Sequence, residues 1–256
     1  MTMLVSVGVC GKRRSRALGA KHPASPAESV ANVRSVETIA LLRRESGLVL
    51  LRGVRRHDRR PVLVLTSDGA GAARDAAQRI EHEYGLRDVL DPEWAAKPIE
   101  LLEEEGRPVL LLTNPGGDIL SRHVGRPWEL GAFLRLAIAL CDALQGVHAR
   151  GLVHRDVKPA NVLFDADVDR GRAWLTSFSI ARLASEAAPR NDEPETIAGT
   201  WAYMAPEQTG HMNRPVDARS DLYSLGIVFY ELLTGAPPFS APDAFGWIHC
   251  LSLIHI

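Results

Sequence analysis

The residues best placed to do chemistry lie together at positions 154–161, which read His-Arg-Asp-Val-Lys-Pro-Ala-Asn. Transfer of a phosphoryl group from ATP needs a carboxylate that accepts the proton of the attacking hydroxyl, and cations that hold the negative charge of the transition state. Asp156 can supply the carboxylate and Lys158 can reach the transferred phosphate, while the amide oxygen of Asn161 can bind a magnesium ion. The segment therefore indicates phosphoryl transfer to a hydroxyl group.

Two further signatures follow this segment in order. Residues 199–207 read Gly-Thr-Trp-Ala-Tyr-Met-Ala-Pro-Glu, and residues 221–226 read Asp-Leu-Tyr-Ser-Leu-Gly. Each alone would more often be an ordinary turn or helix start. The three together, in this order, resemble the catalytic half of the serine/threonine protein kinase family. Related kinases that modify small molecules lack the Ala-Pro-Glu segment, so they match less well.

The resemblance implies a role for each matching residue. Thr200 would bond the catalytic aspartate and lysine, a feature of kinases that act on serine and threonine. Asp221 would tie down the catalytic loop, and Glu207 would pair with an arginine from later in the helical lobe. The catalytic residues implied are Asp156, Lys158, Asn161 and Thr200, the structural or regulatory ones are His154, Arg155, Glu207 and Asp221, and the candidate phosphorylation site, which Arg155 would bind, is Thr196.

A narrower resemblance concerns residues 205–214, 217–225 and 247–250. They look like the amino-terminal domain of bacterial hybrid proteins, which join a serine/threonine kinase-like domain to an ATPase region and a sensor histidine kinase. This resemblance covers roughly residues 35–250. It implies a signal-transduction protein with fused ATPase and histidine kinase domains, and it does not specify the protein substrate.

The segment that should hold ATP departs from the family pattern. Glycines normally let the phosphate-covering loop close over the triphosphate, but Arg43, Glu45 and Leu48 stand in their places. These side chains would obstruct the close approach, and Glu45 would repel phosphate. The next strand should end in a lysine that reaches the α- and β-phosphates, but it has Leu65.

Two acidic positions of the expected site also differ. Ser177 stands where an aspartate should bind magnesium, and a neutral serine cannot replace a carboxylate for a hard cation. Glu83 is the candidate for the helix glutamate that pairs with the missing lysine, and without that partner it is equally well a solvated helix residue. The resemblance implies ATP and Mg²⁺ as cofactors, with Asn161 as a metal ligand, and these departures argue against tight binding.

The elements that position these residues begin with a small strand-rich lobe at residues 35–114. Short apolar runs at residues 48–53, 61–65 and 108–113 predict strands. Residues 74–84 predict a helix. These elements form the nucleotide lobe, which is degenerate at the positions just described.

A helical lobe follows at residues 115–250. A helical period of apolar residues predicts a long amphipathic helix at 127–151. Residues 161–164 and 173–175 predict short strands, and residues 220–234 predict a helix that is apolar on nearly all sides, as in the middle of a lobe. The fold class is therefore α+β, with the two lobes of a protein kinase and a helical lobe that is incomplete.

The two ends of the chain suggest different origins. Residues 1–34 mix basic residues with prolines and show no periodicity, which predicts a disordered tail. Residues 251–256 read Leu-Ser-Leu-Ile-His-Ile and match the translation of a sequencing adapter read in frame. We therefore expect these six residues to be an artefact, with the natural sequence continuing differently after Cys250.

Composition limits the location and the partners of the chain. A formal net charge of −1 gives no general attraction to nucleic acid or anionic lipid. Three scattered cysteines cannot form a disulfide framework and fit a reducing cytoplasm. No segment is expected to approach bilayer length.

Three functions follow from these observations. The first is a serine/threonine protein kinase domain with weakened or lost activity. The second is a pseudokinase, a binding or switch module that regulates attached signalling domains. The third, a small-molecule phosphotransferase, leaves residues 199–207 unexplained.

Overall fold

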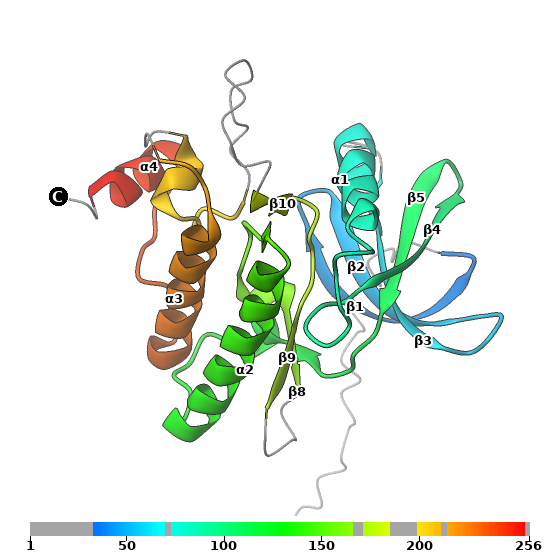
Figure 1. Cartoon of the computed structure of the whole chain (residues 1–256), viewed down its shortest axis with the longest axis horizontal. Coiled ribbons are helices and arrows are strands. Elements are labelled where there is room, and N and C mark those ends of the chain that lie inside the picture. Colours follow the sequence, from blue (N-terminus) through cyan, green and yellow to red (C-terminus); the bar gives the residue numbers. More distant parts are fainter. Residues whose placement is uncertain (1–32, 70–72, 166–170, 185–198, 211–213, 254–256) are drawn as a thin grey trace, which may run out of the picture. The chain divides into compact units, whose positions relative to one another are not determined.

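The computed structural model describes residues 33–69, 73–165, 171–184, 199–210 and 214–253. The first lobe is a five-stranded antiparallel sheet with one helix, α1 (Ala73–Gly85), packed on it (Figure 1). The predicted strands and helix of this lobe are confirmed, and two strands are additions, β1 (Val36–Glu45) and β4 (Pro98–Glu104). In sheet order the strands are β1 (Val36–Glu45), β2 (Leu48–Arg55), β3 (Pro61–Ser67), β5 (Arg107–Thr113) and β4 (Pro98–Glu104).

Alternation along β3 divides the apolar residues of this lobe into two clusters. Leu63 and Leu65 point to the face covered by α1, where Ile80 joins them. Val62 and Val64 point to the opposite face and join a separate cluster. Because successive strand residues face opposite sides, the residue at the expected lysine position lies on the α1 side of the sheet.

Two residues that we assigned to the tail belong to this lobe. Val33 is 2% exposed and packs in the same cluster as Val36. The backbone N–H of Arg34 donates to the carboxylate of Glu104. The lobe therefore begins earlier than predicted, and residues 1–32 of the predicted tail lie outside the described residues.

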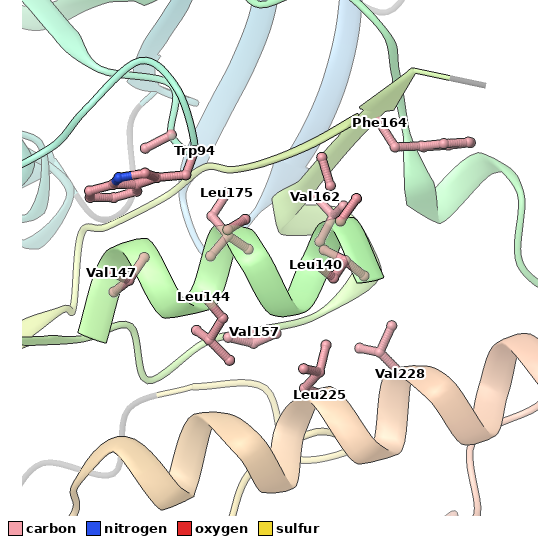
Figure 2. Close-up of a cluster of buried hydrophobic side chains, with 14 of the residues drawn as sticks. Trp94, Leu140, Leu144, Val147, Val157, Val162, Phe164, Leu175, Leu225 and Val228 are labelled. Atoms are coloured by element: carbon pink, nitrogen blue, oxygen red, sulfur yellow. The ribbon is translucent and has the colours of Figure 1, made fainter. Parts of the chain in front are cut away.

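The second lobe is built around the helices α2 (Leu130–Ala149) and α3 (Ala218–Thr234). Leu140 and Leu144 of α2 face Leu225 and Val228 of α3 across the core (Figure 2). The predicted helices and strands of this lobe are confirmed, with α2 starting where the Glu129 carboxylate accepts hydrogen bonds from its first backbone N–H groups. The remaining elements are β6 (Asp118–Ile119), β7 (Leu152–Val153), β8 (Val162–Asp165), β9 (Arg172–Leu175), β10 (Arg182–Leu183), α4 (Ala244–Leu253) and the short 3₁₀ helices at Leu120–Arg122, Pro159–Asn161 and Pro206–Thr209.

The prediction that α3 is surrounded by apolar contacts is only half right. Leu225 and Val228 are buried, but Leu222, Tyr230 and Leu233 are 56%, 48% and 44% exposed. In the described part of the chain, α3 therefore has one buried and one exposed apolar face.

Two other predictions change with the structure. By length and composition α2 could span a bilayer, contrary to our expectation that no segment could. In the structure it packs against α3 and β9 within the core of this lobe. The predicted end of the lobe at residue 250 falls within α4, and Leu251 is 2% exposed.

Candidate active site

The catalytic loop lies between β7 and β8 and is held from α3. The buried carboxylate of Asp221 accepts hydrogen bonds from the backbone N–H groups of His154 and Arg155, both at 2.8 Å. Its Oδ2 also lies 2.9 Å from Nε2 of His148. Arg155 has a φ of 69°, which is unfavourable for a residue with a side chain. The structure thus places Asp221 where it holds the loop in a shape that the local sequence does not favour.

The four residues predicted to act in catalysis form one hydrogen-bonded group. Thr200 Oγ1 donates to Asp156 Oδ1 at 3.0 Å and accepts from Lys158 Nζ. Lys158 Nζ also lies 3.2 Å from Asp156 Oδ2. The side-chain amide of Asn161 donates to Asp156 Oδ2 at 2.8 Å and to the Asp156 carbonyl at 2.7 Å. These contacts orient a carboxylate that can accept the proton of a hydroxyl substrate.

His154 is buried beneath this group. Burial lowers its pKa, so the ring is neutral at pH 7. Nε2 lies 3.1 Å from the carbonyl of Thr176, and Nδ1 lies 3.3 Å from the backbone nitrogen of Asp156. A proton on Nε2 satisfies both contacts, since the ring then donates to the carbonyl and accepts from the amide. The ring also packs on Phe178, which makes His154 a structural residue.

The remaining predicted regulatory residues lie around the loop. The Arg155 side chain is buried, and its backbone carbonyl accepts from Gln208 Nε2 at 2.8 Å. We expected Glu207 to pair with an arginine, and in the structure its Oε1 accepts from the hydroxyl of Ser220 at 2.6 Å. Thr196, the candidate phosphorylation site, lies outside the described residues.

The positions expected to carry the phosphate-binding lysine and the metal-binding aspartate carry neutral side chains. Leu65 is 1% exposed, and its strand neighbours are Leu50 on β2 and Leu110 on β5. Ser177 has a φ of 66°, and its buried hydroxyl has no hydrogen-bond partner in the described part of the chain. Phe178 beside it is fully buried. The backbone at the magnesium position therefore remains, but its carboxylate does not.

Of the two alternatives considered for Glu83, burial rules out the solvated helix residue. Glu83 is fully buried, and burial raises its pKa to about 7, although the positive charge of Arg43 and the backbone amide of Phe178 oppose that change. The sequence could not indicate this burial because it depends on how α1 packs against the sheet. Glu83 therefore faces the site without the lysine that pairs with it in the family. Arg43 is the cation whose charge most strongly lowers the pKa of Glu83.

Arg43 and Glu45 are site residues that the sequence analysis interpreted only as obstructions. Nη1 of Arg43 donates to Oδ1 of Asn161, the atom that we expected to bind magnesium. Oε2 of Glu45 lies 2.8 Å from Nζ of Lys158. Their charges alone were the available signal, since no spacing in the sequence indicates that they reach the catalytic loop.

Magnesium and ATP do not fit the site in this arrangement. A guanidinium occupies the metal-binding side of Asn161, and Ser177 supplies no carboxylate. The cavity lined by Arg43, Glu45, Asp156 and Lys158 encloses about 10 Å³, enough for roughly one water molecule, whereas ligand pockets usually enclose about 300–1,000 Å³. Among the described residues, no group of three His, Cys, Asp or Glu side chains is placed to hold a metal ion.

A larger cavity of about 150 Å³ lies away from this chemistry. It is lined by residues of α2, β8 and β9, including Arg135 and Phe164, and by His123 and Trp128 from the segment before α2. No predicted catalytic residue lines it, so its size does not make it the active site.

The two lobes and the loop between β7 and β8 have the arrangement of a bilobal protein kinase fold. The family model described as "Protein kinase domain" matches residues 65–250. The chain belongs to the protein kinase family, and its relatives place it among the serine/threonine kinases. The α+β bilobal fold expected from the sequence is thereby confirmed.

Several curated relatives carry that description. The chain is 44% identical over 135 residues to serine/threonine-protein kinase Pkn1 of Myxococcus xanthus, which is 52% of this chain and 19% of the relative. It is 43% identical over 118 residues to serine/threonine-protein kinase PknB of Mycobacterium tuberculosis, covering 46% and 18% of the two chains. The matches therefore span a fifth or less of those relatives.

Proposed function

We propose that this chain is the serine/threonine kinase domain of a signal-transduction protein in which phosphoryl transfer is strongly weakened or lost. It would act mainly as a binding or switch module. The observation that carries the proposal is the state of the nucleotide site: Leu65 replaces the phosphate-binding lysine, Ser177 replaces the metal-binding aspartate, and the remaining cavity is about 10 Å³.

The expected loss of rate follows from the missing charges. Removing one preorganised electrostatic group commonly lowers the rate by about 10²- to 10³-fold. If the changes at Leu65 and Ser177 act independently, the loss is on the order of 10⁴- to 10⁶-fold, and less if they act as a unit. Such a rate is too slow for an ordinary kinase.

Thermal unfolding with and without Mg-ATP tests this proposal. A ligand that binds only the folded chain must raise its melting temperature. We expect no rise for the chain as it stands. A rise of several degrees that depends on magnesium would contradict the proposal.

A working kinase is the second candidate, because the group formed by Asp156, Lys158, Asn161 and Thr200 is fully assembled. Transfer of radiolabelled γ-phosphate to a general protein substrate distinguishes the two. The control is Asp156→Asn, which removes the proton-accepting carboxylate. Transfer above that control would establish the second candidate.

The wider setting is also a proposal. The hybrid-protein resemblance supports a cytoplasmic protein in which the domain is fused to an ATPase region and a histidine kinase. Sequencing the complete open reading frame tests this, and a frame that encodes neither domain would refute it.

A further inference from the structure

The β1–β2 hairpin brings two charged side chains to the catalytic loop. Its tip is a two-residue turn at Ser46 and Gly47, with φ angles of 52° and 75°, a pair that suits a tight hairpin. Just before the turn, the register of β1 against β2 shifts between Leu41 and Arg43. Such a bulge redirects a neighbouring side chain, and here Arg43 reaches Asn161.

Arg43 brings a positive charge to the atom that would bind a metal ion. Its Nη1 donates to Oδ1 of Asn161. Burial lowers its pKa, while the carboxylates of Asp156, Glu45 and Glu83 raise it. A guanidinium stays charged in such surroundings. Arg43 therefore has the neighbours that a divalent cation would have.

Glu45 brings a negative charge to the amine that would hold a phosphate. Its Oε2 lies 2.8 Å from Nζ of Lys158, whose side chain is only 5% exposed. The same amine lies 3.2 Å from Asp156 Oδ2 and donates to Thr200. The charge of Lys158 is thus balanced without any substrate.

Arg79 of α1 fastens the tip of the hairpin. Its Nη1 donates to the carbonyl of Ser46 at 3.1 Å, and its Nη2 donates to Oγ of Ser179 at 3.3 Å. One side chain therefore joins α1, the hairpin and the segment after β9. All three surround the small cavity.

We propose that the β1–β2 hairpin is an internal plug of the active site, in which Arg43 takes the place of the metal ion on Asn161 and Glu45 that of a phosphate on Lys158. The plug rests on the proposed function, since a chain that binds Mg-ATP as it stands has no room for it. The plug gives a second reason for weak nucleotide binding. Arg43 and Glu45 close the site, in addition to the loss of charge at Leu65 and Ser177. Nucleotide enters only when the hairpin lifts from the catalytic loop.

The test separates these two causes by restoring the lost residues first. In the 256-residue chain, Leu65→Lys with Ser177→Asp supplies the missing lysine and carboxylate while leaving the plug in place. Adding Arg43→Gly and Glu45→Gly then removes the plug. Melting temperatures are measured with and without Mg-ATP. The matched control adds Arg44→Gly instead, since Arg44 lies on the same strand and pairs with Asp68, away from the loop.

We expect a rise of several degrees with Mg-ATP only in the variant that lacks the plug. An equal rise in the restored chain with Arg43 and Glu45 intact would overturn the plug, as would no rise after their removal. Neither result bears on the proposed function, which fails if the unsubstituted chain binds Mg-ATP or transfers γ-phosphate above the Asp156→Asn control.

A second measurement needs no restored residues and no large rearrangement. The rate at which an amine-reactive reagent labels Lys158 is compared with that of Lys97, which lies in the other lobe, by mass spectrometry. We expect slow labelling of Lys158 in the unsubstituted chain and a several-fold increase with Glu45→Gln. If Lys158 reacts as fast as Lys97 and Glu45→Gln changes nothing, the plug is absent.

Discussion

At the scale of single residues, the site has exchanged one set of charges for another. Leu65 and Ser177 remove one positive and one negative charge relative to the family pattern, and Arg43 and Glu45 add one of each at positions where glycine is expected. Burial of a charge is costly unless a partner offsets it. Arg43 donates to Asn161 and Glu45 pairs with Lys158, so these groups of the catalytic loop have partners from within the chain without a ligand.

Glu83 makes the free energy of unfolding depend on pH. Burial raises its pKa to about 7 in the folded chain, from an ordinary value of 4.5. Between these values the folded chain holds a proton that the unfolded chain has released. The free energy of unfolding therefore falls as the pH rises through this interval, by about 3 kcal/mol in total, and Glu83 causes no further change above it.

Urea unfolding at pH 5 and pH 8 checks this prediction. Glu83→Gln removes the ionisable group, so the decrease between the two pH values should become smaller. Glu81→Gln, an exposed glutamate of the same helix, should leave the decrease unchanged. Equal decreases in the Glu83→Gln variant and the unsubstituted chain would contradict the assignment.

Asp221 carries the second prediction at this scale. Asp221→Ala leaves the buried N–H groups of His154 and Arg155 without their acceptor, which should lower the free energy of unfolding by about 3–5 kcal/mol. Asp217→Ala removes the N-cap of the same helix together with its surface ion pair to Arg219 and should cost about 1 kcal/mol. Denaturant unfolding measures both, and similar losses would mean that Asp221 does not anchor the loop.

At the scale of elements, the sequence predicted what depends on local spacing. The catalytic loop, the helices α1, α2 and α3, and the strands β2, β3, β5, β8 and β9 follow from motifs and apolar periods within short segments. The burial of Glu83 and the reach of Arg43 could not be predicted, because they depend on the packing of α1 and on the bulge between Leu41 and Arg43. Sequence spacing identified the loop but not the side chains that close over it.

Helix packing predicts opposite effects on stability for a glycine-to-alanine change in α2 and in α3. Glycine to alanine within a helix normally stabilises it by about 1 kcal/mol. A Cβ at Gly146 of α2 would lie 2.6 Å from Nε1 of Trp94, whereas one at Gly226 of α3 would meet nothing within 4 Å. Gly146→Ala should therefore destabilise the chain by about 1–3 kcal/mol, and Gly226→Ala should stabilise it.

Thermal and urea unfolding of the two variants provide the measurement. Because both changes add one methyl group inside a helix, the difference between them reports packing alone. Stabilisation by Gly146→Ala would show that Trp94 moves aside at little cost.

At the scale of the whole chain, we expect the exposed apolar face of α3 to promote self-association. Leu222, Tyr230 and Leu233 recur at spacings that place them on one side of the helix, and all three are exposed in the described part of the chain. Contiguous exposed apolar residues favour association. The buried face of α3 carries the lobe's core, so changes on the exposed face should leave the fold intact.

Leu222→Lys combined with Leu233→Lys should lower self-association without lowering the melting temperature, because it adds charge to a surface that packs on nothing described. Sedimentation or light scattering across a concentration series measures the association. Ile99→Lys at an exposed position on β4, compared with the single variant Leu222→Lys, adds the same charge and separates the effect of this face from that of added charge. If Ile99→Lys lowers association as much, net charge is responsible, and the exposed face of α3 has no special part in it.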